Sequence, residues 1–96
     1  MTIGAARVTV YLPEAISLKE KRGVIKSVIA RARNKFNAGI AEVEDLDDMR
    51  VATIGIVCVS NNGGHADEML QAVIGFIERN VAFGTLGEVE TELIPH

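Results

Sequence analysis

The spacing of apolar residues in this chain switches between the period of a strand and the period of a helix. Residues 3–12 alternate between two sides, which is the pattern of a strand. Ser17 and Glu20 then have the spacing of a helix capping box. After them, apolar residues recur every three or four positions up to Phe36. The first part of the chain therefore predicts a strand followed by a helix of about five turns that ends before Gly39.

The rest of the chain makes the same switch in a different order. Its patterns predict strands at 39–44 and 51–60, a helix from Ala66 to near Gly84, and a strand at 88–94. The polar, acidic stretch 45–49 joins the first two of these strands as a loose hairpin turn. The predicted order of elements is βαββαβ.

Two strand–helix–strand units in this order predict an α+β fold, the ferredoxin-like βαββαβ sandwich. We expect a four-stranded antiparallel sheet with strand order 4-1-3-2 and both helices on one face. Residues 1–96 should form a single domain, because the chain is too short to bury two cores. This fold occurs in enzymes, metal carriers, RNA binders and regulatory modules, so function has to be inferred from particular residues.

The composition excludes several classes of protein. With 48% hydrophobic and 24% charged residues, the chain should be globular rather than disordered. It has no apolar run of the roughly 18 residues that a membrane span needs, and its first residues lack the pattern of a signal peptide. A single cysteine, Cys58, excludes an internal disulfide and a zinc site built on cysteine pairs. We therefore expect a cytoplasmic protein that contacts no membrane.

The basic residues are concentrated in the first predicted helix. Seven of the ten Lys and Arg residues lie between positions 17 and 35, where Glu20 is the only acid. The rest of the chain carries a large excess of acids, so the net charge of −3 hides a dipolar molecule. Cations near a helix start oppose the helix dipole, and stability alone would not place them there.

One row of this helix is the candidate phosphate-binding site. At about 100° per residue, four basic side chains fall within about 60° of one another, and a fifth, Lys21, supports the helix start. The candidate RNA- or phosphate-binding residues are Lys19, Lys21, Arg22, Lys26 and Arg33. The alternative is an ordinary solvated helix face, whose long side chains cover the edge of the core.

The uncovered face of the predicted sheet is a second candidate surface. Its central positions are mostly small or apolar and include one aromatic residue, Tyr11, so base stacking of the RRM type is not expected. Acidic side chains are expected to border it, from Glu42 and Glu44 on one edge strand and Glu88, Glu90 and Glu92 on the other.

Such an apolar strip suggests a twofold homodimer, in which Arg7 meets Glu42 or Glu90. The candidate interface residues are Ile3, Ala5, Arg7, Val57 and Val59. The alternative is a face that stays half wet and carries only small residues.

Catalytic and metal-binding patterns are missing from the sequence. His65 has no second ligand at metal-binding spacing, and we interpret it as a capping or packing residue. Cys58 is expected to pack in the core as an inert thiol, and Ser17 and Ser60 to cap backbone groups. The acidic turn 45–49 lacks the glycine and the final acid of a calcium-binding EF-hand loop. We expect no enzyme activity, no metal and no cofactor.

The hexamer Ser17-Leu18-Lys19-Glu20-Lys21-Arg22 resembles the YlxP-like family, small bacterial proteins catalogued as a domain of unknown function. Three further stretches are similar to that family: residues 33–37, residues 41–44, and residues 59–61 together with His65. The resemblance implies a ferredoxin-like fold and a cytoplasmic protein. It also implies a gene that is often beside those of a ribosome-binding factor and a translation initiation factor.

Two functional hypotheses of different classes follow. The first is a non-enzymatic RNA- or ribosome-associated binding module that acts through the basic first helix, with RNA rather than DNA as its partner. The alternative is a homodimeric small-ligand-binding or regulatory module that uses the open sheet face. A third class, an enzyme with residues contributed across a dimer, has no candidate residues in the sequence.

Overall fold

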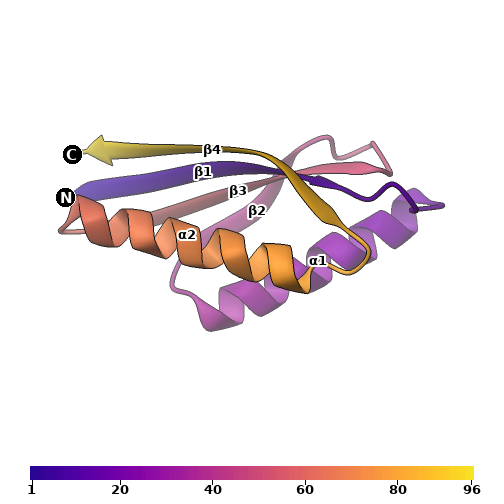
Figure 1. The fold of residues 1–96 in the computed structure, drawn as a ribbon, viewed down its shortest axis with the longest axis horizontal. Helices are drawn as coiled ribbons and strands as arrows, with labels where there is room; N and C mark the ends of the chain where they lie inside the picture. The colour runs from indigo at the N-terminus through magenta and orange to yellow at the C-terminus, as the bar shows by residue number, and fades with distance from the viewer.

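The computed structural model describes residues 1–96 and has the predicted order of elements (Figure 1). The elements are β1 (Thr2–Tyr11), α1 (Leu18–Lys35), β2 (Gly39–Glu44), β3 (Val51–Ser60), α2 (Gly63–Asn80) and β4 (Thr85–Pro95). The four strands are antiparallel and lie in the order β2-β3-β1-β4, which is the predicted order 4-1-3-2. Both helices lie on one side of the sheet (Figure 1), so the fold prediction is confirmed.

Side-chain caps determine where both helices begin. The Ser17 hydroxyl accepts a hydrogen bond of 3.0 Å from the backbone N–H of Glu20, as the capping-box spacing predicted. The Asn62 side chain accepts a bond of 3.1 Å from the N–H of His65 at the start of α2. These caps fix the starts of the two helices that cover the sheet.

The end of α2 differs from the prediction by one turn. The helix stops at Asn80, and Val81 leaves it but stays buried, so an apolar residue at helical spacing extended the pattern past the true end. Phe83 then turns the chain with a φ of 58°, in the left-handed region. As a result β4 begins at Thr85, before the first residue of the predicted strand.

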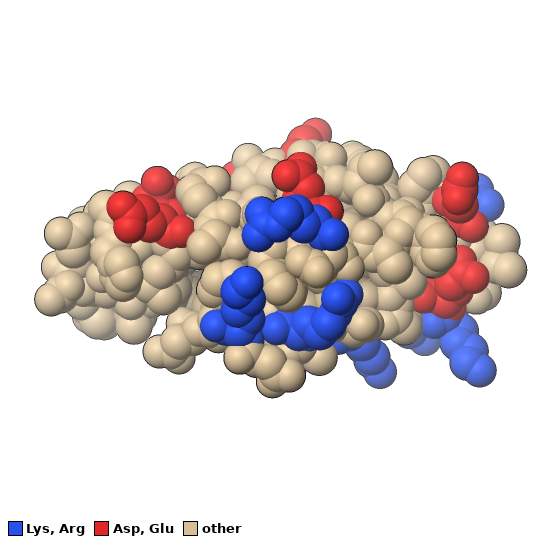
Figure 2. All heavy atoms as spheres, turned by 60° about the horizontal axis from the view of Figure 1, so that its bottom comes forward, with Lys and Arg blue, Asp and Glu red and all other residues tan.

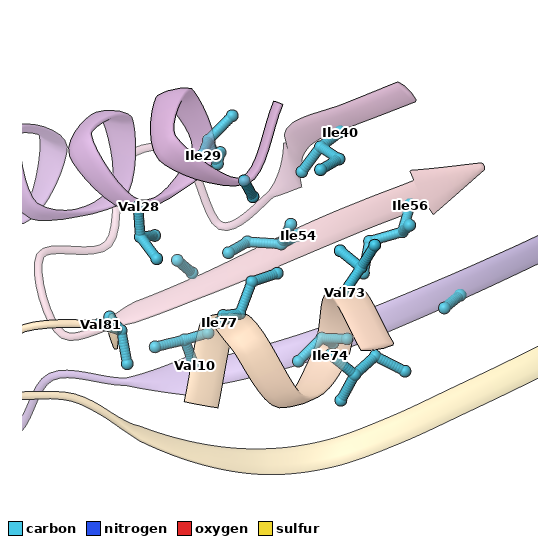
Figure 3. Close-up of a cluster of buried hydrophobic side chains, with 14 of the residues drawn as sticks. Val10, Val28, Ile29, Ile40, Ile54, Ile56, Val73, Ile74, Ile77 and Val81 are labelled. Carbon is cyan, nitrogen blue, oxygen red and sulfur yellow. The ribbon is translucent and has the colours of Figure 1, made fainter. Parts of the chain in front are cut away.

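The core lies between the sheet and the helices. Alternate residues of β1 and β3 point toward the helices and meet one apolar stripe from each, as Figure 3 shows for Val10, Ile54 and Ile77. The largest side chains with almost no exposure include Val8, Val10, Val28, Ile25, Ile54, Ile56, Leu70, Val73 and Ile77. Because both helices pack on this face, the opposite face of the sheet is left open to solvent.

Register irregularities interrupt the outer strands. β1 pairs with β3 without a break, from Thr2 opposite Ser60 to Tyr11 opposite Val51. The pairing of β2 with β3, in contrast, shifts between Glu42 and Glu44. A shift of this kind changes the side of the sheet on which the following residues point. That shift puts Glu44 on the opposite side of the sheet from Glu42.

Candidate functional site

Three residues of the predicted basic row are exposed on α1: Lys19, Arg22 and Lys26. Lys19 and Lys26 make no ion pair and no hydrogen bond within the chain. Arg22 lies 3.7 Å from Asp47, and both side chains are largely exposed. Exposed pairs of this kind contribute little to stability, so all three cations can contact an external anion.

Arg33 is also exposed, but its guanidinium has a partner within the fold. Its Nε donates a hydrogen bond of 2.9 Å to the carbonyl oxygen of Ile40, and its Nη2 donates to the same oxygen. This carbonyl belongs to β2, the outer strand of the sheet beside α1. Arg33 therefore connects the end of α1 to the sheet edge and keeps only part of its donor set for a ligand.

Lys21 does not belong to the row, and its assignment to the phosphate site is corrected. The side chain has no exposure, and its Nζ lies 2.7 Å from Glu42 Oε2 and donates to the carbonyl oxygen of Asp45 at 2.7 Å. Two residues after Lys19, it is turned by about 200° around the helix and points toward the sheet. A side chain without exposure has no access to phosphate.

Glu42 does not border the open sheet face, and this expectation is also corrected. It stands opposite Ile54 on the helix side of the sheet, and the shift in β2 then places Glu44 opposite Thr53 on the other side. The Glu42 side chain keeps 14% of its exposure. Its Oε2 has no contact with solvent and makes no hydrogen bond of regular geometry. The ionic partner of this oxygen is the Lys21 ammonium.

The Lys21–Glu42 pair continues into the turn after β2. Asp45 has a φ of 61°, and its carboxylate accepts a hydrogen bond of 2.7 Å from the hydroxyl of Thr53. Thr53 is buried although it lies on the outer face of the sheet, opposite Glu44. Lys21 of α1 and Thr53 of β3 therefore both donate hydrogen bonds to Asp45.

Other basic residues extend the positive surface beyond the predicted row. Figure 2 shows Lys and Arg side chains gathered over the middle and one edge of the helix side of the molecule. Arg31 donates to the carbonyl oxygen of Asn80 at the end of α2, at 2.8 Å. Lys35 lies 5.7 and 5.3 Å from the ring centroids of Phe36 and Phe76. Both residues therefore have structural partners.

The open sheet face contains a shallow hollow of about 650 Å³. Its floor includes Ala5, Gly55 and Val57, and its lining includes the charged residues Arg7, Glu44, Glu90 and Glu92. Within the chain, Arg7 pairs with Glu44 across the sheet at 3.3 Å. The expected contact of Arg7 with Glu42 or Glu90 concerned a second copy and stays a prediction.

Four of the predicted interface residues form an apolar area beside this ion pair. Val57 and Val59 are 49% and 59% exposed, and Ile3 and Ala5 are half-buried between them and β4. Tyr11, the single aromatic residue predicted for this face, lies close over Gly87, where an added Cβ would clash with its ring. The open face thus has an apolar centre and carboxylates at its rims.

Exposed apolar side chains in two loops were not identified from the sequence. Ile16 and Phe83 are each 80% exposed. Phe83 lines a smaller hollow of about 210 Å³ with Glu14 and Glu20, near the start of α1. No periodic pattern marks either residue, because each lies in a connection between elements.

The residues weighed for chemistry have structural partners. His65 Nδ1 lies 3.0 Å from the Ser60 hydroxyl, which also accepts a bond from the N–H of Asn62. Cys58 is 4% exposed, and its Sγ is 3.6 Å from the carbonyl oxygen of Ala66. The structure has no group of three or more His, Cys, Asp or Glu side chains placed to hold a metal ion. Neither helix has the length and apolar character needed to cross a membrane.

The Cys58 thiol is expected to be unreactive in the folded protein. Burial raises the pKa of the Cys58 thiol above its ordinary value, so it stays protonated at neutral and mildly alkaline pH. The unfolded thiol ionises at a lower pH, so this residue should lower the stability as the pH rises above the ordinary thiol pKa. An aromatic disulfide reagent at pH 8 should modify the native protein at least about tenfold more slowly than the denatured protein. Equal rates would contradict the burial of this side chain.

The fold defines the class of the protein as a ferredoxin-like α+β module with one basic helix face and one open sheet face. The chain belongs to the DUF503 family, described as a protein of unknown function, whose sequence model matches residues 3–88. A relative in Bacillus subtilis (strain 168), "Uncharacterized protein YlxP", is 38% identical over 76 residues, which are 79% of this chain and 83% of the relative. The expected family is therefore confirmed.

A solved structure with a similar fold is a C-terminal segment of the alpha subunit of aIF2 from Pyrococcus abyssi. The similarity covers 100% of this chain with a TM-score of 0.50 and 17% sequence identity. This chain covers 50% of that chain, so the similarity is between the fold of this protein and the fold of one part of the solved segment.

Proposed function

We propose that the protein is a non-enzymatic, cytoplasmic RNA- or ribosome-associated binding module that acts through the exposed row of α1, namely Lys19, Arg22 and Lys26, with Arg33 at its far end. The observation that carries the proposal is the state of Lys19 and Lys26, which are exposed and have no partner within the chain. Lys19 lies in the first turn of α1, where an uncompensated cation opposes the helix dipole and so costs stability while it gains binding to an anion.

The dimensions of the row suit a nucleic-acid backbone. Lys19 and Lys26 are separated by about 10 Å along the helix axis, and Arg22 lies between them on the same side. Each cation that neutralises a phosphate releases condensed counterions, which makes binding strong at low salt and independent of sequence. The resemblance to a family whose genes accompany translation genes favours RNA over other polyanions.

Binding of RNA and of small ribosomal subunits tests this proposal. The double variant Lys19→Gln and Arg22→Gln should weaken binding to both and lower the slope of log affinity against log salt by about 0.7 to 0.9 for each lost contact. Titrations between about 50 mM and about 300 mM salt measure that slope. The unfolding free energy of the variant should stay within about 0.5 kcal/mol of the parent, because both side chains are exposed.

A charge-conserving exchange is the matched control. In the double variant Lys19→Arg and Arg22→Lys, the row keeps its charge, so the salt slope should equal that of the parent protein. If the glutamine variant binds both targets as well as the parent at low salt, the row is an ordinary solvated helix face and the proposal is wrong.

A further inference from the structure

The open sheet face carries acidic side chains that have no partner in the fold. By register, Glu90 and Glu92 of β4 stand beside Arg7 and Ala5 on the outer side of the sheet. Arg7 is already paired with Glu44, and neither Glu90 nor Glu92 makes an ion pair. The hollow between the two edges therefore has an excess of negative charge over an apolar floor.

We propose that this face docks a basic amphipathic helix of another protein. The central strands β3 and β1 supply the apolar floor, chiefly through Val57, Val59 and Ala5. The carboxylates of β2 and β4 stand on either side of it, three strand spacings or about 14 Å apart. A helix is about 10 Å wide, so one helix covers the floor and brings Lys or Arg side chains to both rims.

A second copy of the chain fits this face less well. A twofold arrangement of two sheet faces brings β4 against either β4 or β2 of the second copy, and both strands carry outward carboxylates. Like charges placed together across an interface oppose association. The expected homodimer would have to bury Glu90 and Glu92 near other acids, whereas a basic partner neutralises them.

RNA is a poor occupant of this face for a related reason. Glu44, Glu90 and Glu92 repel phosphates, and the hollow has no aromatic lining on which bases could stack. The inference is independent of the proposed RNA-binding function, because it concerns the opposite side of the sheet from the helices. Either proposal can fail without the other.

A synthetic peptide is the probe for this docking surface. An amphipathic peptide of about 18 residues, built of leucine and lysine at helical spacing, spans about 27 Å and fits along the strands. Titration into the isotopically labelled protein should shift the amide resonances of β1 and β3 more than those of α1 and α2. The same peptide with glutamate in place of lysine should not bind, because it meets carboxylates of the same sign.

Two charge-reversal variants separate a defined site from general attraction. The double variant Glu90→Lys and Glu92→Lys should bind the peptide about tenfold more weakly than the parent. The control variant Glu68→Lys and Glu78→Lys makes the same change of charge at exposed positions of α2 and should change the affinity by less than about twofold.

The variant Val57→Glu completes the test. It should weaken peptide binding, and its sedimentation should equal that of the parent protein, because the proposed occupant is not a second copy. Equal losses in the two charge-reversal variants, or resonance shifts confined to the helices, would overturn the proposal. A peptide-free dimer that Val57→Glu dissociates would also overturn it and would assign the face to a second copy.

Discussion

Replacement of Lys21 by methionine is expected to lower the unfolding free energy by about 3 kcal/mol. The change keeps an unbranched apolar stem, one atom shorter, but removes the charge that lies 2.7 Å from Glu42 Oε2 and the donor that binds the Asp45 carbonyl at the same distance. Glu42 would then be a mostly buried carboxylate without a cation. Urea denaturation at pH 7 measures the loss.

The double variant Lys21→Met and Glu42→Leu tests whether the loss comes from the unpaired charge. It should regain at least half of the stability lost in the single variant, because an apolar pair of similar volume avoids the cost of burying ions. The exposed neighbour is the control, since Lys19→Met should change the stability by no more than about 0.5 kcal/mol. If Lys21→Met is as stable as the parent, the buried pair contributes nothing to the fold.

A methyl group added at Gly4 is expected to cost about 1 to 3 kcal/mol of stability. An added Cβ would lie 2.9 Å from Cys58 Sγ and 3.1 Å from Leu70 Cδ1, so α2 and β3 would both have to move. The Cys58→Ala variant alone should lose about 1 to 2 kcal/mol through the small cavity it leaves. Combined with Gly4→Ala, it removes the atom that obstructs the new methyl group.

The cost of the combined variant should therefore be smaller than the sum of the two single costs. Thermal unfolding of the parent and the three variants completes the double-mutant cycle. Additive costs would mean that the clash is relieved by a shift of α2 against Leu70 rather than by the space at Cys58. The Cys58→Ala variant should keep any RNA binding, because Cys58 lies in the core and away from α1 row residues such as Lys19.

The elements and their order could be predicted from local patterns. The Ser17 cap, the helical stripe through Ile25 and Ala32, and the alternation of β1 depend on residues near one another in the chain. Physical rules for short segments therefore sufficed for the fold. They also placed Lys19, Arg22 and Lys26 correctly on one exposed side of α1.

The position of Glu44 could not be predicted in the same way, and those of Lys21 and Glu42 were predicted wrongly. Alternation along β2 puts Glu42 and Glu44 on the side of Ile40, which faces the core, and only the pairing of β2 with β3 introduces the shift that moves Glu44 to the open face. On its helix Lys21 already lies outside the row, at about 100° from Arg22 and about 160° from Lys19. Local patterns do not reveal the acid that makes the burial of Lys21 possible, because Glu42 lies 21 residues away along the chain.

The two sides of this molecule differ in charge, with an excess of cations on α1 and unpaired carboxylates on the sheet side. The electric field of a highly charged particle exerts a torque on such a protein while the two are still separated by solvent. The protein therefore needs less time to reach its binding orientation near a polyanion, because the acidic sheet side is turned away during the approach. Near a polyanion the sheet side therefore faces outward, toward the solvent and any other macromolecule that arrives.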